Sequence, residues 1–197
     1  MSTTIEHEKR RKEILEKALD VFIEDGFEDA TLQRIADRCG ITRTILYLYF
    51  KNKRDIFNYS IKQLLIKVEE GILEIQADTS LNSVERITTV LLNILKLLEQ
   101  NRQLLSIILD YLMHLSKSGN NPETKVRRRT LRLRHILTSM VIEGVKAGEL
   151  KKIKVKTADD FLYSFIEAAI FHLVVLKREN LDGLKDTVVF AVKQFMA

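Results

Sequence analysis

The sequence predicts an all-α protein of about nine helices, in which an N-terminal three-helix domain with a helix-turn-helix is joined by a long helix to a C-terminal helical bundle. Composition supports this fold class: the 197 residues include one proline and seven glycines, so few positions interrupt a helix, and 46% are hydrophobic, enough to form a core. Apolar residues also recur at helical spacing in successive segments.

The first predicted helix covers residues 8–25. Gly26 follows it and is suited to end a helix. Its apolar positions fall on one face and are Ile14, Leu15, Ala18, Leu19, Phe22 and Ile23. We expect this face to cover the two short helices that follow.

Those two short helices are separated by a tight turn. Thr31 is a natural N-cap for the first, and Gly40 permits the turn that ends it. Thr42 is a second N-cap and starts the next helix. The residues expected to face the core are Leu32, Ile35, Ala36 and Cys39 in the first helix and Leu46 and Phe50 in the second. Cys39 is expected to pack as a small apolar residue, with a redox switch as the alternative.

The second short helix turns outward a set of residues suited to DNA. A recognition helix needs donors at its N-terminal end, where base edges can be reached. Arg43 offers a guanidinium fork that fits O6 and N7 of guanine, and Thr44 offers a hydroxyl or a methyl group for thymine. Tyr47, Tyr49 and Lys53 are better placed for phosphates, which fix the register without reading sequence.

Basic residues are concentrated in the same segment. Between residues 34 and 54, six basic side chains stand against one acid, Asp37. The six are Arg34, Arg38, Arg43, Lys51, Lys53 and Arg54. Asn52 is expected to cap the following helix, so the first N–H groups of that helix also face an anion. The net charge of +5 and the pI near 9.2 also suit a polyanionic partner.

Residues 14–57 resemble the N-terminal domain of the TetR family of bacterial transcription regulators. The matching elements are Glu24-Asp25-Gly26-Phe27, Thr31, Ile35-Ala36, Gly40-Ile41, Thr42 and Leu46-Tyr47-Leu48-Tyr49-Phe50, followed by Lys51-Asn52-Lys53. Leu48 stands where the family often has a polar or aromatic residue, so no base contact carries over to this position.

The resemblance implies a homodimer on a palindromic operator of double-stranded DNA, repression of transcription, and a C-terminal domain that responds to an unknown small-molecule effector. Carried over position by position, it implies DNA contacts by Thr31, Gln33, Thr42, Arg43, Thr44, Tyr47, Tyr49 and Lys53.

A long helix from Lys53 to about Gln76 is predicted to follow without a flexible linker. The predicted domains are therefore a DNA-binding domain over residues 1–52 and an effector-binding and dimerisation domain over residues 53–197. Rotation of this helix is expected to change the distance between the two DNA-binding domains of a dimer.

Helix starts and stops are also readable further along the chain. Asn82 and Glu85 form a capping-box pattern for a helix through Leu98, and Asn101 is expected to cap the next helix. The polar residues 116–121 predict a loop. Pro122 then suits the first turn of a helix to about Ala147, which Gly148 ends.

The last two helices are the predicted dimer interface. Thr157 is expected to open a helix whose residues 161–176 are apolar at nearly every position, so its whole surface needs cover. Only one further helix follows, so a second copy of the chain is expected to provide part of that cover. The predicted interface residues are Phe161, Phe165, Ala168, His172, Val188, Val192 and Phe195.

Several residues allow two interpretations. Tyr111, His114, Met140 and His172 are candidates for effector binding, and core or interface packing explains the same residues. Asp110 and His114 are one helical turn apart, which favours a hydrogen-bonded pair over a metal site. The basic residues Lys125, Arg127, Arg128, Arg129, Arg132 and Arg134 predict a solvated face paired with acids, with an anionic effector or a second nucleic-acid contact as the alternatives.

The sequence favours a cytoplasmic regulator over an enzyme. The single cysteine excludes an internal disulfide framework. No signal peptide or membrane span is expected, and no phosphate loop, metal-protease motif, nucleophile elbow or cofactor motif is found. The competing function class is a helical ligand-binding or interaction module whose helix-turn-helix is only structural.

Overall fold

The computed structural model describes residues 2–119 and 121–197, and within them the side chains of all residues except 2–4, 122, 124, 125, 128 and 129. This part of the chain contains nine α-helices and one π-helical segment, which confirms the predicted all-α fold. In chain order they are α1 (Ser2–Asp29), α2 (Leu32–Cys39), α3 (Arg43–Tyr49), α4 (Lys53–Ala77), α5 (Ser83–Gln100), α6 (Arg102–Lys117), α7 (Pro122–Lys146), α8 (Val155–Ile170), η1 (Phe171–Val175) and α9 (Asp182–Lys193).

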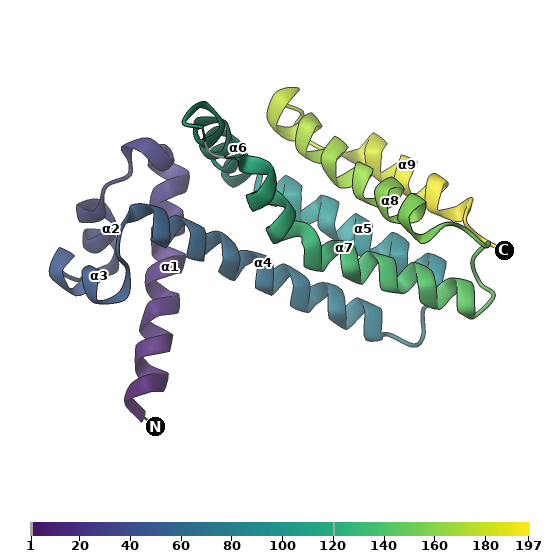
Figure 1. The fold of residues 1–197 in the computed structure, drawn as a ribbon, viewed down its shortest axis with the longest axis horizontal. Helices are drawn as coiled ribbons and strands as arrows, with labels where there is room; N and C mark the ends of the chain where they lie inside the picture. Colours follow the sequence, from purple (N-terminus) through teal and green to yellow (C-terminus); the bar gives the residue numbers. More distant parts are fainter. Residues whose placement is uncertain (1, 120) are drawn as a thin grey trace.

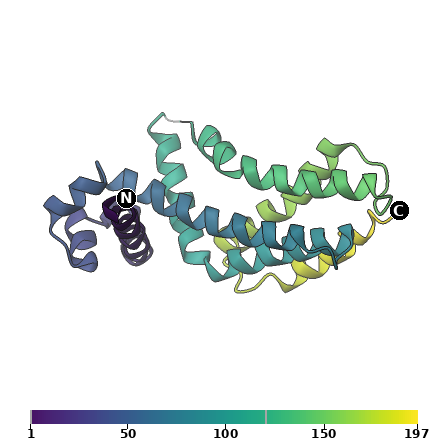
Figure 2. The same ribbon diagram turned by 90° about the horizontal axis from the view of Figure 1, so that it is seen from below.

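The molecule is elongated and has two ends of different build (Figure 1). Helices α1 to α3, here called the N-terminal unit, lie at one end. Helices α5, α7, α8 and α9, here called the C-terminal bundle, lie at the other. Helix α4 runs from the N-terminal unit along the bundle, and α6 stands between the two ends, across the direction of α4 (Figure 2).

Helix α1 confirms the predicted first helix and starts earlier, at Ser2. Gly26 has φ +80° and ψ 170°, so regular helical geometry stops there, as predicted. A positive φ of this size favours glycine, which has no Cβ to clash with the backbone. Ile14, Ala18 and Phe22 are buried, so the predicted apolar face does form part of a core.

The start of α5 is the predicted capping box. Asn82 Oδ1 accepts a hydrogen bond from Glu85 N at 3.0 Å, and Glu85 Oε2 accepts one from Asn82 N at 2.9 Å. Asn101 occupies the predicted N-cap position of α6, but its side chain does not cap the helix. Its side-chain Nδ2 donates to Leu97 O at 2.8 Å, so the side chain is engaged with the preceding helix and makes no cap bond to α6.

The later helices differ from prediction mainly at their ends. Helix α7 begins at Pro122 and is followed by Gly148 with φ +75°, both as predicted. Helix α8 begins at Val155 rather than Thr157, and residues 171–175 continue it as the π-helix η1. A π-helix is wider than an α-helix, so the period of 3.6 does not describe this last turn.

Buried apolar residues form two clusters. The larger joins α5, α7, α8 and α9 and gives the C-terminal bundle its core, with Leu95, Leu137 and Leu162 almost inaccessible to solvent. The smaller lies in the N-terminal unit and also includes residues from α4 and α6. These are Ile56 and Phe57 from α4 and Ile107, Tyr111 and Leu115 from α6. The predicted domain division after residue 52 stays a prediction.

An aromatic group docks α6 on the N-terminal unit. The ring centroid of Tyr111 lies 4.6 Å from that of Phe27 and 5.0 Å from that of Phe57. Phe57 in turn meets Phe22 edge to face at 4.9 Å. Aromatic pairs at these distances add to the free energy gained by burial. Helix α6 is therefore part of the N-terminal core although it follows α5 in the chain.

Candidate nucleic-acid interface

The turn between α2 and α3 has the predicted local geometry. Thr31 Oγ1 accepts a hydrogen bond from Arg34 N at 3.1 Å, and Thr42 Oγ1 accepts one from Ile45 N at 3.3 Å. Gly40 has φ +66° and ψ 35°, the left-handed conformation that ends α2. The two caps and the glycine fix the chain direction on both sides of the turn, and with it the orientation of α3.

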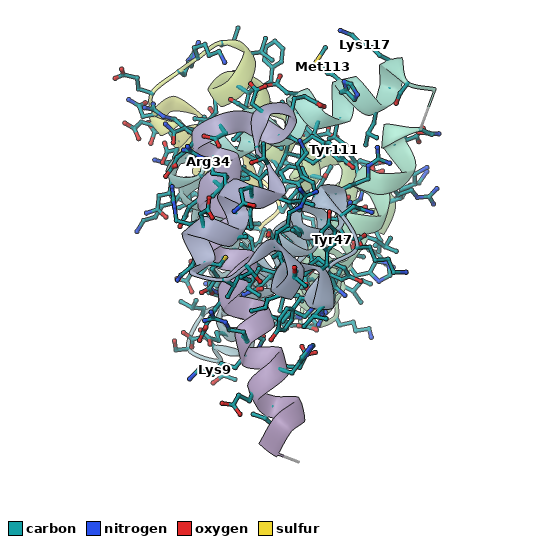
Figure 3. All side chains as sticks on the ribbon, turned by 90° about the vertical axis from the view of Figure 1, so that its left-hand side faces the viewer. Lys9, Arg34, Tyr47, Tyr111, Met113 and Lys117 are labelled. Atoms are coloured by element: carbon teal, nitrogen blue, oxygen red, sulfur yellow. The ribbon has the colours of Figure 1, made fainter. Side chains whose placement is uncertain are left out.

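Helix α3 is anchored by one face and open on the other. Leu46 and Phe50 are 1% and 4% exposed, as predicted for core residues. Arg43, Thr44 and Tyr47 are exposed. Figure 3 views the molecule from the end that carries the N-terminal unit, and it labels Tyr47 on α3 and Lys9 near the start of α1. The structure therefore brings the three predicted outward residues onto one accessible surface.

Arg43 and Tyr47 are joined within this surface. Arg43 Nη2 donates to Tyr47 Oη at 3.0 Å, and the guanidinium carbon lies 5.5 Å from the centroid of the tyrosine ring. The hydrogen bond and the cation–π contact restrict the rotamers of both side chains. Less conformational entropy is then lost when a ligand orders them.

Arg34 and Arg38 are exposed, and both form ion pairs with acidic residues of α1. Arg34 pairs with Glu24 at 3.1 Å and with Asp25 at 2.6 Å, and Arg38 also pairs with Glu24. The hydrogen bond from Arg38, followed by contributions from Arg34, lowers the pKa of Glu24. The local excess of positive charge expected from residues 34–54 alone is therefore reduced, because α1 supplies acids from outside that segment.

Two predicted phosphate-contacting residues have protein partners. Lys53 Nζ donates to Glu28 O at 2.7 Å and lies 4.9 Å from the centroid of the Phe27 ring. Tyr49 stacks on His7 with ring centroids 4.5 Å apart. Both residues are only partly exposed. Phosphate binding by Lys53 would compete with the contact to Glu28.

Lys51 and Arg54 are more accessible than Lys53. Both are exposed and flank the capped start of α4, where Asn52 Oδ1 accepts from Asp55 N at 2.9 Å. The sequence counted them as basic residues but gave no reason to prefer them to Lys53. Among the other predicted contacts, Gln33 Nε2 donates to Asp37 Oδ1 at 2.8 Å on the exposed side of α2.

The four predicted effector residues do not share a site. Tyr111 is buried in the N-terminal core, and Met140 is buried in the bundle core. His114 lies at the surface, with Nδ1 3.7 Å from Glu28 Oε1, so it faces Glu28 of α1 rather than pairing along its own helix. His172 lines a small hollow beside the start of α9. Helical spacing identified these residues as inward or polar positions but not which neighbours they meet.

A larger cleft lies between α6, α7 and α8. Its volume is about 830 Å³, within the range of small-molecule sites. The lining combines apolar residues with charged ones near its edge. The lining residues are Leu109, Leu112, Met113, Ser116, Glu123, Val126, Arg127, Thr130, Leu131, Arg134, Tyr163 and Glu167. None of the four predicted effector residues is among them.

The basic residues of α7 divide between ion pairs and this cleft. Arg132 Nε lies 3.2 Å from the largely buried Glu69 of α4. Arg134 binds Asp159 and Asp160 of α8, and the hydrogen bond from Arg134 to Asp159 is the main reason that the pKa of Arg134 is raised. Arg127 is exposed at the cleft. Pairing with acids is thus the observed role of Arg132 and Arg134, while the side chains of Lys125, Arg128 and Arg129 lie outside the described residues.

The predicted dimer-interface residues fall into two groups. Val188 and Val192 are 0% exposed and Phe165 is 8% exposed, because α8 and α9 bury these side chains in the bundle core. They have little or no surface left for a second copy of the chain. Phe161, Ala168, His172 and Phe195 keep some exposure.

Six large apolar side chains of α8, η1, α9 and the residues that follow η1 and α9 are exposed, and this set is here called the apolar ridge. Its members are large side chains between 37% and 67% exposed: Phe161, Phe171, Val175, Leu176, Phe190 and Met196. Four of them precede α9 and two belong to or follow it. The sequence missed most of these residues because helical spacing does not say which apolar side of a helix faces its own core.

Cys39 packs as predicted. It is 4% exposed, and burial raises the pKa of its thiol. A raised thiol pKa lowers the fraction of reactive thiolate.

None of the described helices is long and apolar enough to cross a membrane.

Comparison with known proteins supports the interpretation of the N-terminal unit. Residues 14–59 match the family model described as bacterial regulatory proteins, tetR family. The chain is 26% identical over 170 residues to the fatty acid metabolism regulator protein of Bacillus subtilis, covering 83% of this chain and 84% of the relative.

Solved structures share the whole fold. The transcriptional regulator FadR from Bacillus subtilis, in complex with stearoyl-CoA, aligns with a TM-score of 0.75 at 23% identity, over 94% of this chain and 98% of that one. A TetR transcription regulator from Haloarcula marismortui aligns with a TM-score of 0.82 at 20% identity, over 96% of this chain and 100% of that one. The resemblance thus extends from the N-terminal unit through the C-terminal bundle.

Proposed function

This chain belongs to the TetR family of bacterial transcription regulators, and from that premise we propose that it represses transcription as a homodimer bound to a palindromic operator, from which a small-molecule ligand releases it. The observation that carries the DNA-binding part is the exposed set of Arg43, Thr44 and Tyr47 on a capped helix anchored by its other face. A helix-turn-helix that was only structural would not need these donors on its open side. That alternative is therefore the weaker one.

Arg43 is assigned to base reading and Lys51 and Arg54 to phosphates. The guanidinium of Arg43 stands on the first turn of α3, where a recognition helix reaches base edges. Lys51 and Arg54 lie beyond the end of α3, at the start of α4. Lys53 is instead assigned a structural role, because its hydrogen bond to Glu28 O ties α4 to the end of α1.

A selected DNA duplex tests these roles. We expect a random pool to yield a preferred sequence with two inverted half-sites. Arg43→Ala should weaken binding to it by about 1 to 3 kcal/mol and relax one base preference, whereas Lys51→Ala should weaken all duplexes alike and reduce the salt slope by about one. Equal losses on selected and random DNA for both variants would contradict this division of roles.

The homodimer is proposed to form through the apolar ridge on α8, η1 and α9. Exposed apolar area of this kind marks protein interfaces. On α8 the small residues Ser164 and Ala168 follow Phe161 at helical spacing, which permits close approach of a second helix. Helices α8 and α9 lie on the side of the bundle away from α4 and far from α3, so a second copy seated on them leaves α3 accessible (Figure 1).

The ligand is proposed to be a long-chain acyl-CoA that binds in the cleft between α6, α7 and α8. The support is the resemblance to the fatty acid metabolism regulator and to FadR, which is described in complex with stearoyl-CoA. The apolar side chains of Leu109, Leu112 and Leu131 suit an acyl chain, and Arg127 suits a phosphate.

Helix α6 is the proposed connection between ligand and DNA. Leu109, Leu112 and Met113 line the cleft, while Tyr111 and Leu115 belong to the N-terminal core. A ligand that displaces α6 must therefore disturb the packing of the N-terminal unit. Helix α6 contacts α1 directly, as α4 does, but α6 also lines the cleft.

Calorimetric titration of stearoyl-CoA tests the ligand. Its affinity for the operator-bound protein should be lower than for the free protein by the factor by which it weakens operator binding, since coupling is reciprocal. Coenzyme A without the acyl chain is the control and should bind more weakly. Equal stearoyl-CoA affinities in the two titrations would rule out acyl-CoA as the ligand that controls DNA binding.

A further inference from the structure

Leu48 is the most exposed large apolar residue that the structure describes, at 74%. It lies on α3 between two residues that do face the core, Leu46 at 1% and Phe50 at 4% exposed. Exposure of leucine to water is unfavourable unless a partner covers it. Leu48 is not among the core residues of the N-terminal unit, so a partner that covers it would come from outside this unit.

The open side of α3 carries two adjacent rows of side chains. One row is polar and consists of Arg43 and Tyr47, joined by their 3.0 Å hydrogen bond. The other is Thr44 and Leu48, one helical turn apart and both exposed. Ile45, at 39% exposed, flanks the second row. A hydrogen-bonding row thus runs beside an apolar one on the same surface.

The chemistry of the major groove offers an apolar counterpart to the second row. Of the four unmodified bases, only thymine presents a methyl group there, at C5. We propose that Leu48, together with the methyl group of Thr44, reads thymine C5-methyl groups and is a specificity-determining residue of the protein. The inference rests on the proposed sequence-specific DNA binding.

Charge favours DNA over a protein as the partner for Leu48. Arg43 is exposed at the start of α3, and Lys51 and Arg54 are exposed beyond its end, so the surface that holds Leu48 is cationic. A polyanion neutralises these charges as it covers the leucine. The apolar ridge proposed for dimerisation belongs to α8, η1 and α9, so a second copy seated on it does not cover Leu48 (Figure 1).

Deoxyuridine scanning of a selected duplex is the test. The probe is the duplex that the wild-type protein enriches from a random-sequence pool, with each thymine replaced in turn by deoxyuridine, which removes only the C5 methyl group. At one symmetric pair of thymines, each replacement should weaken wild-type binding by about fourfold, the value expected for one buried methyl group.

Leu48→Ala and Ile5→Ala separate the role of Leu48 from general effects of removing an exposed apolar residue. Leu48→Ala should bind the unmodified duplex more weakly, and deoxyuridine at the same positions should then have little further effect, because the methyl contact is already lost. Ile5 is 71% exposed and lies on α1, outside the recognition helix, so Ile5→Ala should keep the wild-type response.

Each outcome has a distinct meaning. A selected duplex that tolerates deoxyuridine at every thymine overturns the inference and leaves the proposed function intact. An undiminished deoxyuridine effect in Leu48→Ala also overturns it and assigns the methyl contact to another residue. A pool in which no sequence is enriched overturns the proposed function itself, and the inference with it.

Discussion

The N-terminal unit and the C-terminal bundle are both helical, but they meet their surroundings differently. The N-terminal unit has a closed core, capped short helices and ion pairs that tie α2 to α1. Its open face is the polar and apolar surface of α3. The bundle has the larger core, yet it leaves a cleft of about 830 Å³ and an apolar ridge uncovered. On the proposed function, the N-terminal unit holds a single shape, and the bundle receives a ligand and a second copy of the chain.

Helix α6, like α4, contacts both ends of the molecule. One of its sides lines the cleft, and another packs Ile107, Tyr111 and Leu115 into the N-terminal core. An effect of the cleft on DNA binding therefore needs only one helix to move. If this contrast holds, the closed end and the open end should respond differently to substitution.

The largest expected effect comes from the closed core. Phe57 is 0% exposed and contacts Phe22, Phe27 and Tyr111, so Phe57→Ala leaves a cavity where two helices meet α6. The free energy of unfolding should fall by about 3 to 5 kcal/mol. Chemical denaturation measures this loss. Met113→Ala, at a cleft position that is 60% exposed, is the control and should change stability by no more than about 0.5 kcal/mol.

The apolar ridge should respond to charge by dissociation. Phe190 is 67% exposed, so Phe190→Glu should keep the protomer folded while weakening the dimer by about 2 kcal/mol or more. Sedimentation measures the change in association. Val188→Glu, two residues away and fully buried, should instead unfold the protein. A fully dimeric Phe190→Glu variant would place the interface elsewhere.

Close packing around Gly144 of α7 should leave no room for a larger residue at this position. A Cβ there would lie 2.6 Å from Leu150 Cδ1 and 2.7 Å from Ser83 Cβ. Gly144→Ala should therefore destabilise the protein by about 1 to 3 kcal/mol through overpacking. A Cβ added at Gly71 in α4 would meet no atom within 4 Å, so Gly71→Ala should stabilise by about 0.5 to 1 kcal/mol. Thermal unfolding of the two variants should shift in opposite directions.

The caps of the N-terminal unit should have smaller effects. Thr42→Ala removes the acceptor of the Ile45 N–H and should cost about 1 kcal/mol of stability. Thr44→Ala, on the same helix but away from the cap position, should cost no more than about 0.5 kcal/mol and affect DNA binding instead. Similar losses of stability in both variants would show that the Thr42 cap has no special role.

The smallest effect concerns pH. The pKa of Glu24 in the folded protein is lower than its ordinary value of 4.5, mainly because Arg38 donates a hydrogen bond to the carboxylate. Its contribution to stability is thus present above the unfolded pKa and is lost as pH falls through the folded pKa. Glu24→Gln should flatten the acid side of the stability curve measured by denaturation. An unchanged acid limb would contradict this role for the ion pairs.

Local interactions were predictable from the sequence, whereas contacts between distant segments were not. The caps at Thr31, Thr42 and Asn82 depend on residues three positions away, so their patterns were sufficient. The bond from Lys53 to Glu28 spans 25 residues, and no local pattern indicates it. Val192 is buried by its own chain. Burial by a second copy would require the same apolar spacing, so the sequence could not distinguish the two cases.

The effector candidates failed to converge for the same reason. Tyr111 and Met140 were identified as inward-facing, and each does face a core. Which core, and which side of α6 faces the cleft, depends on how several helices pack around one another. The aromatic contact between Tyr111 and Phe27 joins residues far apart in the chain, and only the assembled fold brings them together.

Operator affinity of a variant with a filled cleft tests the role of α6 most directly. Leu109→Trp places a bulky side chain at the cleft side of α6, without altering any residue of α1 to α3. If α6 couples the two ends, this variant should stay folded and bind the selected duplex about 5- to 150-fold more weakly, the range typical of allosteric coupling. Val155→Trp, at an exposed position at the start of α8, should bind like the wild type. Wild-type operator affinity in a folded Leu109→Trp protein would contradict the account.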